Sequence, residues 1–173
     1  MPKKYGDYKQ SVRQGEAVEV LFMDALKKKY PDCTVSSSTI FENYVKHIDV
    51  NFELGNCKTT FDVKSEKKVS RSDENTSKEY TWVEIQNNFG GNGWAYGSEK
   101  YLAFEWNDEF IIVERKKLLN MVQTCKLPGI LTENKNLPEY AQYQRAKWGN
   151  KDICVLTPIA DIRKIAHMTI EKS

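Results

Sequence analysis

The sequence predicts an α/β protein with a mixed central β-sheet flanked by helices. Three observations predict this class: an amphipathic helical pattern near the N-terminus, several stretches in which polar and apolar residues alternate, and a helical segment after a late apolar strand. The chain has 173 residues, of which 40% are hydrophobic. This length suits one well-packed domain, so we expect a single domain over residues 1–173.

The first predicted element is a helix over residues 11–30. Apolar residues recur there at intervals of three and four, which gives one buried stripe, and Pro31 ends the helix. The stripe consists of Val18, Leu21, Phe22, Ala25 and Leu26.

A β-hairpin follows over residues 47–54 and 59–64, joined by a turn at Gly55 and Asn56. The first strand alternates strictly, which places Asp49 on its polar face. In the second strand Asp62 and Lys64 are two residues apart, so their side chains point to the same face.

The rest of the chain continues the α/β pattern. Residues 81–86 are expected to form the third strand of the same sheet, and about 65–79 to form a flexible loop. A second hairpin (101–106 and 110–114), a helix (116–124), a loop (126–136), a last strand (153–156) and a terminal helix (159–168) are predicted after them.

Two acids and a lysine on neighbouring strands suit the chemistry of phosphodiester hydrolysis. Mg²⁺ takes oxygen ligands, which Asp49 and Asp62 would supply. The cation would activate a water and offset charge on the phosphate, while Lys64 would orient that water or stabilise the transition state. The alternative is that these residues form an ordinary ion pair on the solvent face of a strand.

Asp49, followed by Asp62-Val63-Lys64, resembles the PD-(D/E)xK nuclease superfamily, with Ile48 in place of the proline. The resemblance covers about residues 15–86. It implies a restriction-endonuclease-like core and a DNA endonuclease that depends on Mg²⁺, with Mn²⁺ as a substitute. It further implies a metal site formed by Asp49, Asp62 and an acid on the preceding helix, with Lys64 at the nucleophilic water.

Two positions add to this expected site. The helix-borne acid is either Glu16 or Glu19, and Glu19 is favoured because it lies on the flank of the apolar stripe. The alternative is that both glutamates are ordinary solvated charges of the helix. The Gly15-x-x-x-Glu19 spacing resembles the start of archaeal Holliday junction resolvases. Gln86, with or without Glu84, matches the position at which the superfamily often supports the metal-bound water.

Two other functions stay open: a Holliday junction resolvase with the same fold and site, and a non-catalytic nucleic-acid-binding module. By analogy with small nucleases of phages and mobile elements, a homodimer acting on DNA is expected.

The net charge of +2 excludes a generally basic nucleic-acid-binding protein, so any such surface must be local. Trp94 and Tyr96 would stack on bases or, alternatively, anchor their glycine-rich loop to the core. The candidate contacts are Lys9, Arg13, Lys67, Lys68, Trp94, Tyr96, Arg145 and Lys147.

The four cysteines are scattered and are not clustered with either histidine, which argues against a zinc site. Reduced thiols favour a cytoplasmic protein, with a bacterial or phage-infected cell as the expected setting. No apolar stretch is long enough to cross a membrane, so no membrane association is expected.

Overall fold

The computed structural model describes residues 4–39, 41, 43, 46–70, 72–133, 135–145 and 149–172, with the side chains of residues 4–13 left aside. The chain is α/β, with three α-helices and two mixed sheets in these residues. The helices are α1 (Lys4–Lys29), α2 (Arg115–Cys125) and α3 (Ile159–Lys164), and a 3-10 turn, η2, spans Trp94–Tyr96. The strands are β1 (Thr34–Ser37), β2 (Val50–Leu54), β3 (Cys57–Lys64), β4 (Tyr80–Gln86), β5 (Tyr101–Trp106), β6 (Glu109–Glu114), β7 (Ile130–Leu131), β8 (Gln142–Gln144), β9 (Ile153–Pro158) and β10 (Ala166–Glu171).

The chain divides into two compact units, each assembled from separate segments. Unit 1 comprises Met1–Ser65, Glu99–Ile112 and Met168–Ser173, and unit 2 comprises Glu66–Ser98 and Val113–His167. This division does not test the expectation of a single domain, which stays a prediction.

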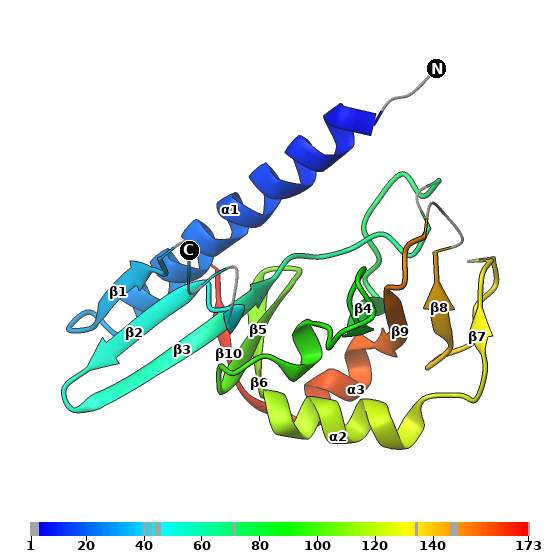
Figure 1. The fold of residues 1–173 in the computed structure, drawn as a ribbon. Coiled ribbons are helices and arrows are strands. Elements are labelled where there is room, and N and C mark those ends of the chain that lie inside the picture. The colour runs from blue at the N-terminus through cyan, green and yellow to red at the C-terminus, as the bar shows by residue number, and fades with distance from the viewer. Residues whose placement is uncertain are drawn as a thin grey trace. The chain divides into compact units, whose positions relative to one another are not determined.

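Unit 1 is built on a six-stranded sheet in the order β1-β2-β3-β5-β6-β10. The first three strands are antiparallel, whereas β3 and β5 run parallel. Helix α1, blue in Figure 1, contacts β1 and β3. Phe22 on this helix packs edge-on against Phe61 and Phe110, with ring centroids 5.1 and 4.9 Å apart. All three rings belong to the hydrophobic core of unit 1.

The predicted hairpin is confirmed as β2 and β3. Leu54 pairs with Cys57, so Gly55 and Asn56 form a two-residue turn in which Gly55 has a φ of 58°. The alternation is confirmed too, because Val50 and Phe52 are buried and Asn51 between them is only half-buried. The strand nevertheless begins at Val50 rather than at residue 47, since the backbone of His47 is left-handed (φ 57°).

Helix α1 starts earlier than expected and ends one residue before the expected terminus. Most of the predicted stripe is confirmed in the core. Leu21 was wrongly included, because 39% of it is exposed. The sheet contacts a narrower arc of the helix, and the half-buried Met23 packs against the core instead.

Unit 2 contains the second sheet, in the order β4-β9-β8-β7, with α2 and α3 in the same unit. The expectation that residues 81–86 form the third strand of the hairpin's sheet is therefore wrong. Strand β4 pairs with β9, and β5 takes the place beside β3. Val83 of β4 and Val155 of β9 are partners and are both fully buried, so burial of their apolar side chains accounts for the pairing.

The second hairpin and α2 are confirmed, while the C-terminal region differs from the prediction. Helix α3 ends at Lys164, and residues 166–171 form β10, which is next to β6 in the sheet. Ile170 is buried there in the core of unit 1, which explains why this segment is extended rather than helical. Short strands that the sequence did not reveal are β1, β7 and β8.

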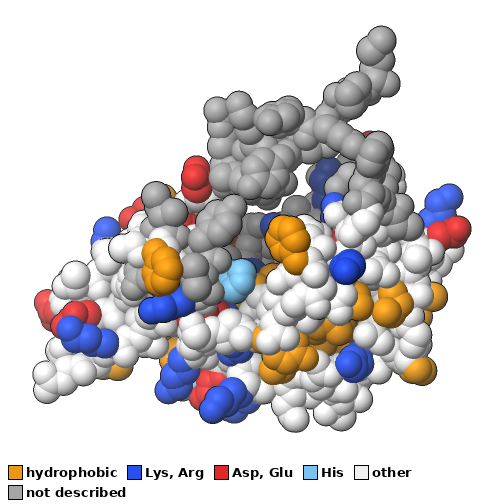
Figure 2. Space-filling view, in the orientation of Figure 1, with side chains coloured by type: hydrophobic (Ala, Val, Ile, Leu, Met, Phe, Trp, Pro, Cys, Tyr) orange, Lys and Arg blue, Asp and Glu red, His pale blue; other side chains and the backbone are white. Residues whose placement is uncertain are grey.

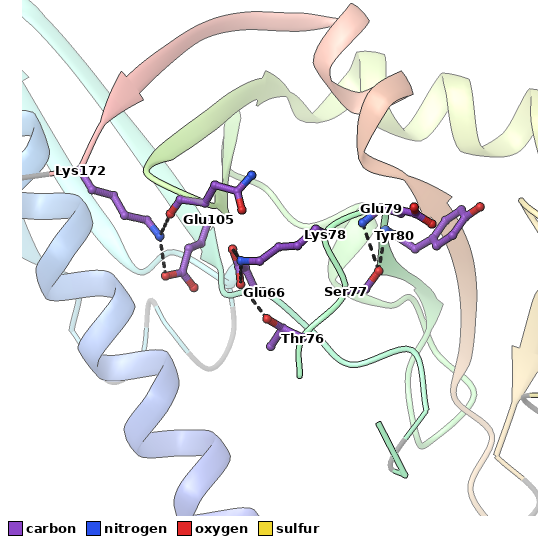
Figure 3. Close-up of polar contacts among 9 residues, drawn as sticks. Glu66, Thr76, Ser77, Lys78, Glu79, Tyr80, Glu105 and Lys172 are labelled. Carbon is purple, nitrogen blue, oxygen red and sulfur yellow. Dashed lines mark hydrogen bonds and ion pairs between the residues drawn. The ribbon is translucent and has the colours of Figure 1, made fainter. Parts of the chain in front are cut away.

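The segment 65–79 has no helix or strand among its described residues, although it is extensively hydrogen-bonded. Both carboxylate oxygens of Glu66 accept from the ammonium of Lys78, at 2.6 Å each, and Thr76 donates to the same carboxylate (Figure 3). Ser77 N donates to Lys67 O at 2.8 Å. These contacts join the two ends of the segment. The predicted flexibility of the residues between them stays a prediction.

No helix in the described part of the chain has the length and apolar character needed to cross a membrane.

Candidate functional site

Asp49 lies directly before β2 and is held by four hydrogen bonds. Its backbone N donates to Phe61 O and its carbonyl accepts from Ser38 N, both at 2.9 Å. Phe61 is also the partner of Val50, so two successive residues face one, as in a β-bulge. The carboxylate accepts from Asn43 Nδ2 at 2.8 Å and from Val63 N at 2.7 Å.

Asp62 and Lys64 lie two residues apart on β3 and form an ion pair through Oδ1 and Nζ. Only 1% of the Asp62 side chain and 19% of the Lys64 side chain are exposed. The pair between Glu53 and Lys58 on the same hairpin has side chains that are 45% and 74% exposed. Asp62 and Lys64 are therefore not an ordinary ion pair on a solvent face.

Glu19 on α1 is half-buried, whereas Glu16 is exposed. Burial raises the pKa of Glu19, and the negative charges of Glu16 and Asp62 raise it further, while Lys64 lowers it. Glu19 thus lies within electrostatic reach of Asp62 and Lys64. Of the two helix acids considered from the sequence, Glu19 is the one that the fold brings to the D-x-K residues.

Burial raises the pKa of Asp49 to about 8, and the neighbouring charge of Asp62 adds to the shift. Lys64 and the hydrogen bond from Val63 act in the opposite direction, and Glu19 adds a smaller increase. Three carboxylates and one ammonium therefore form one electrostatic group in unit 1, with more negative than positive charge when all are ionised.

The chemistry of this donor set suits a hard divalent cation, because all its ligating atoms are carboxylate oxygens. Within the residues that the structure describes, no three His, Cys, Asp or Glu side chains are arranged as a ready cage for a metal ion. Mg²⁺ does not require one, since it commonly uses one or two carboxylates together with waters and substrate phosphate. Asp49 and Asp62 meet that smaller requirement.

Asn43 was missed by the sequence analysis. It belongs to a segment without a periodic pattern, and no motif marks it. Its amide orients the Asp49 carboxylate, and an amide can donate to an ionised carboxylate or accept from a protonated one. A polar residue shortly before a predicted acidic strand was the only available signal.

Gln86 and Glu84 lie on β4, in the sheet of unit 2. The side chain of Gln86 donates to the carbonyl of Lys151 at 2.5 Å. The predicted role of Gln86 at a metal-bound water depended on a strand next to β3, a position that β5 occupies. That role stays a prediction without support from the sheet order.

The structure describes the side chains of only some of the predicted nucleic-acid contacts. Lys67 and Lys68 are exposed, and Arg145 is half-buried. The side chains of Lys9 and Arg13, and the whole of Lys147, lie outside the described residues. On the face seen in Figure 2, basic side chains occur singly or in small groups and acidic ones lie among them.

The glycine-rich loop is hydrogen-bonded to α2 within unit 2. Trp94 O accepts from the guanidinium of Arg115, and the Tyr96 hydroxyl accepts from the amide of Gln123, both on α2. Ala95 between them is buried. The Trp94 contact comes from its backbone and Tyr96 is 39% exposed, so both predicted roles of these two rings stay predictions.

No family model, curated protein or solved structure matches this chain. The geometry and chemistry of Glu19, Asp49, Asp62 and Lys64 are therefore the basis for its candidate function.

Proposed function

We propose that Glu19, Asp49, Asp62 and Lys64 form the active site of a metal-dependent nuclease that hydrolyses phosphodiester bonds in DNA. The observation that carries the proposal is the burial of Asp49 and Asp62 beside Lys64: 9% of Asp49 and 1% of Asp62 are exposed. Two nearly buried carboxylates beside one lysine, with the pKa of Asp49 raised by burial and by the charge of Asp62, are typical of a functional site.

A purely structural role explains these residues poorly. Removing a carboxylate from water costs several kcal/mol, and one lysine offsets only part of the charge of three acids. Apolar residues of similar size would stabilise the same positions better, as they do at Phe61 and Val63 on the same strand. Binding of a divalent cation and a polyanionic substrate would account for the three acids.

In this proposal Asp49 and Asp62 hold Mg²⁺ or Mn²⁺, and Glu19 adds charge from the helix. When bound, the cation supplies an activated water and neutralises charge on the phosphate. Asn43 and the N–H of Val63 fix the direction of the Asp49 carboxylate. Lys64 stabilises the negative charge that develops on the phosphate oxygens.

The order of the elements supports the resemblance to PD-(D/E)xK nucleases. An acid-bearing helix precedes a hairpin, whose first strand follows Asp49 and whose second carries Asp62 and Lys64. A restriction-endonuclease-like core and a homodimer acting on DNA belong to the same proposal.

The test is cleavage by the full chain with Mg²⁺, Mn²⁺ or EDTA, on supercoiled plasmid, linear duplex, single strands, RNA and a four-way junction. We expect metal-dependent cutting that Lys64→Ala lowers by about 10²-fold or more, since lost transition-state stabilisation has this size. Lys58→Ala is the matched control, because Lys58 is a paired lysine on the same strand with a largely exposed side chain.

Removing Lys64 leaves buried Asp62 without this counter-ion, which costs about 3–5 kcal/mol of stability. A double variant, Asp62→Asn with Lys64→Met, removes both charges at similar volume and should be folded but inactive. Cleavage by this folded double variant at the wild-type rate would refute the site. Preference for the four-way junction would identify a resolvase, and binding without any cleavage would identify a non-catalytic module.

A further inference from the structure

Residues 87–92 of unit 2 form a turn that exposes one aromatic side chain almost completely. Phe89 is 91% exposed, and no other large apolar side chain among the described residues exceeds 64%. Single exposed apolar residues are common on protein surfaces, so exposure alone has no functional meaning. The residues around Phe89 indicate a function for this exposed ring.

The turn is held in a fixed conformation by Asn87. Its side-chain oxygen accepts from Phe89 N and Gly91 N, and its amide donates to Asn92 O, all at 3.0 Å. Asn87 N donates to Gly91 O, and Gly90 N donates to Asn87 O, both at 2.9 Å. Gly90 has a φ of 85°, a conformation suited to glycine. The ring of Phe89 is therefore presented by an ordered backbone.

A second segment fixes the turn and supplies a cation. Lys151 N donates to Asn88 O at 3.3 Å, and Lys151 O accepts from the side chain of Gln86. The aliphatic part of Lys151 lies against the turn, because a Cβ built on Gly90 would be 3.2 Å from Lys151 Cδ. Lys151 is exposed, so it adds a positive charge beside the turn that carries Phe89.

The residues around Phe89 indicate which partner it suits. Its neighbours in the turn are asparagines and glycines, so the turn itself supplies no second apolar side chain, whereas protein-binding and membrane-binding surfaces use a continuous apolar patch. A nucleobase needs only one aromatic face on which to stack, and a nearby lysine can bind the adjacent phosphate. Base stacking requires a base that is not already paired and stacked.

We propose that Phe89 stacks on an unpaired nucleobase while Lys151 binds a neighbouring phosphate. The protein would then prefer nucleic acids with unpaired bases, either single strands or distorted duplexes. This inference deepens the proposed nuclease function and rests on it for its biological meaning, but the contact itself is measurable without catalysis.

The experiment measures binding by fluorescence anisotropy in EDTA, with labelled single-stranded DNA, single-stranded RNA and duplex DNA. We expect Phe89→Ala to weaken binding to the single strands by about 5- to 150-fold, the range that loss of one stacked base covers. Phe89→Leu should lower the affinity for single strands to a similar extent, because leucine keeps much of the apolar volume but has no aromatic ring. Phe89→Trp should keep the wild-type affinity, because tryptophan can stack on a base. Leu131→Ala is the control: Leu131 is 45% exposed in the same unit and should have no effect.

Lys151→Met keeps the aliphatic stem and removes the charge. It should reduce the dependence of log K on log salt for single strands by about 0.7, the value for one phosphate contact. Unchanged affinity of Phe89→Ala for single strands, or wild-type affinity of Phe89→Leu, would overturn the proposal. The proposal would also be overturned if the wild type bound phospholipid vesicles in a Phe89-dependent way and did not bind oligonucleotides.

Cleavage in Mg²⁺ separates this proposal from the proposed function. If the wild type cuts DNA while Phe89→Ala binds single strands normally, the stacking proposal fails and the nuclease stands. If binding depends on Phe89 but no substrate is cut with any metal, stacking is supported and the nuclease fails.

Discussion

Asp49 has a carboxylate for which a proton and a divalent cation would compete. Burial raises its pKa to about 8, whereas an aspartate in an unfolded chain has a pKa of about 3.9. Between these values the folded state binds the extra proton, so in the absence of metal this residue destabilises the fold increasingly as pH rises from about 4 to 8.

We therefore expect metal affinity to depend steeply on pH. The dissociation constant for Mn²⁺, measured by electron paramagnetic resonance or calorimetry, should fall about tenfold per pH unit up to about pH 8 and level off above it. The same measurement on Asn43→Leu should give a curve displaced to higher pH, because the ionised carboxylate loses a donor. An affinity that is constant between pH 6 and 8 would exclude Asp49 as a ligand.

At the scale of elements, Gly93 sets how closely the segment after the exposed turn approaches β4. A Cβ at Gly93 would lie 2.4 Å from Glu84 O and 2.9 Å from Gln86 N, both backbone atoms that cannot move aside easily. Gly93 N also donates to Ile85 O. The end of β4 therefore requires glycine at this position.

Gly93→Ala is expected to lower the free energy of unfolding by at least about 1–3 kcal/mol, as overpacking does. Thermal denaturation followed by circular dichroism measures this effect. Gly15→Ala is the opposite control: Gly15 is in α1 with open space around it, so alanine should stabilise the helix by about 0.5–1 kcal/mol. Equal melting temperatures for Gly93→Ala and the wild type would contradict the close approach.

At the scale of the whole molecule, the chain passes between the two compact units four times, after Ser65, Ser98, Ile112 and His167. The last two crossings fall inside strands β6 and β10. Phe110, Ile111, Ile112 and Val113 of β6 are all buried, so loss of either unit would disrupt one buried strand.

We expect the two units to unfold in one cooperative transition. Tryptophan fluorescence can follow unit 2 in a Trp106→Phe variant, because Trp106 lies in unit 1 and Trp82 and Trp94 lie in unit 2. The midpoint of urea unfolding by fluorescence should coincide with that from far-ultraviolet circular dichroism. Two separate midpoints would show that the units unfold independently.

Local sequence patterns were enough to predict the β2–β3 hairpin and the placement of Asp62 and Lys64 on β3, whereas Asp49 lies just before β2 rather than on it. These features depend on local properties, namely strict alternation and the Gly55-Asn56 turn, which short segments encode without help from the rest of the chain. The approach of α1 to this hairpin was likewise predictable from its apolar stripe, although Leu21 was misplaced.

The strand that lies next to β3 and the depth at which Asp62 is buried could not be predicted in this way. β4 and β5 both alternate or carry apolar runs, so no local signal separates the strand that pairs with β3 from the one that pairs with β9. Likewise, Asn43 reaches Asp49, and Glu19 reaches Asp62 and Lys64, only because separate segments pack together. Pairing and burial between distant segments depend on the summed packing of the whole chain, which short-range patterns do not record.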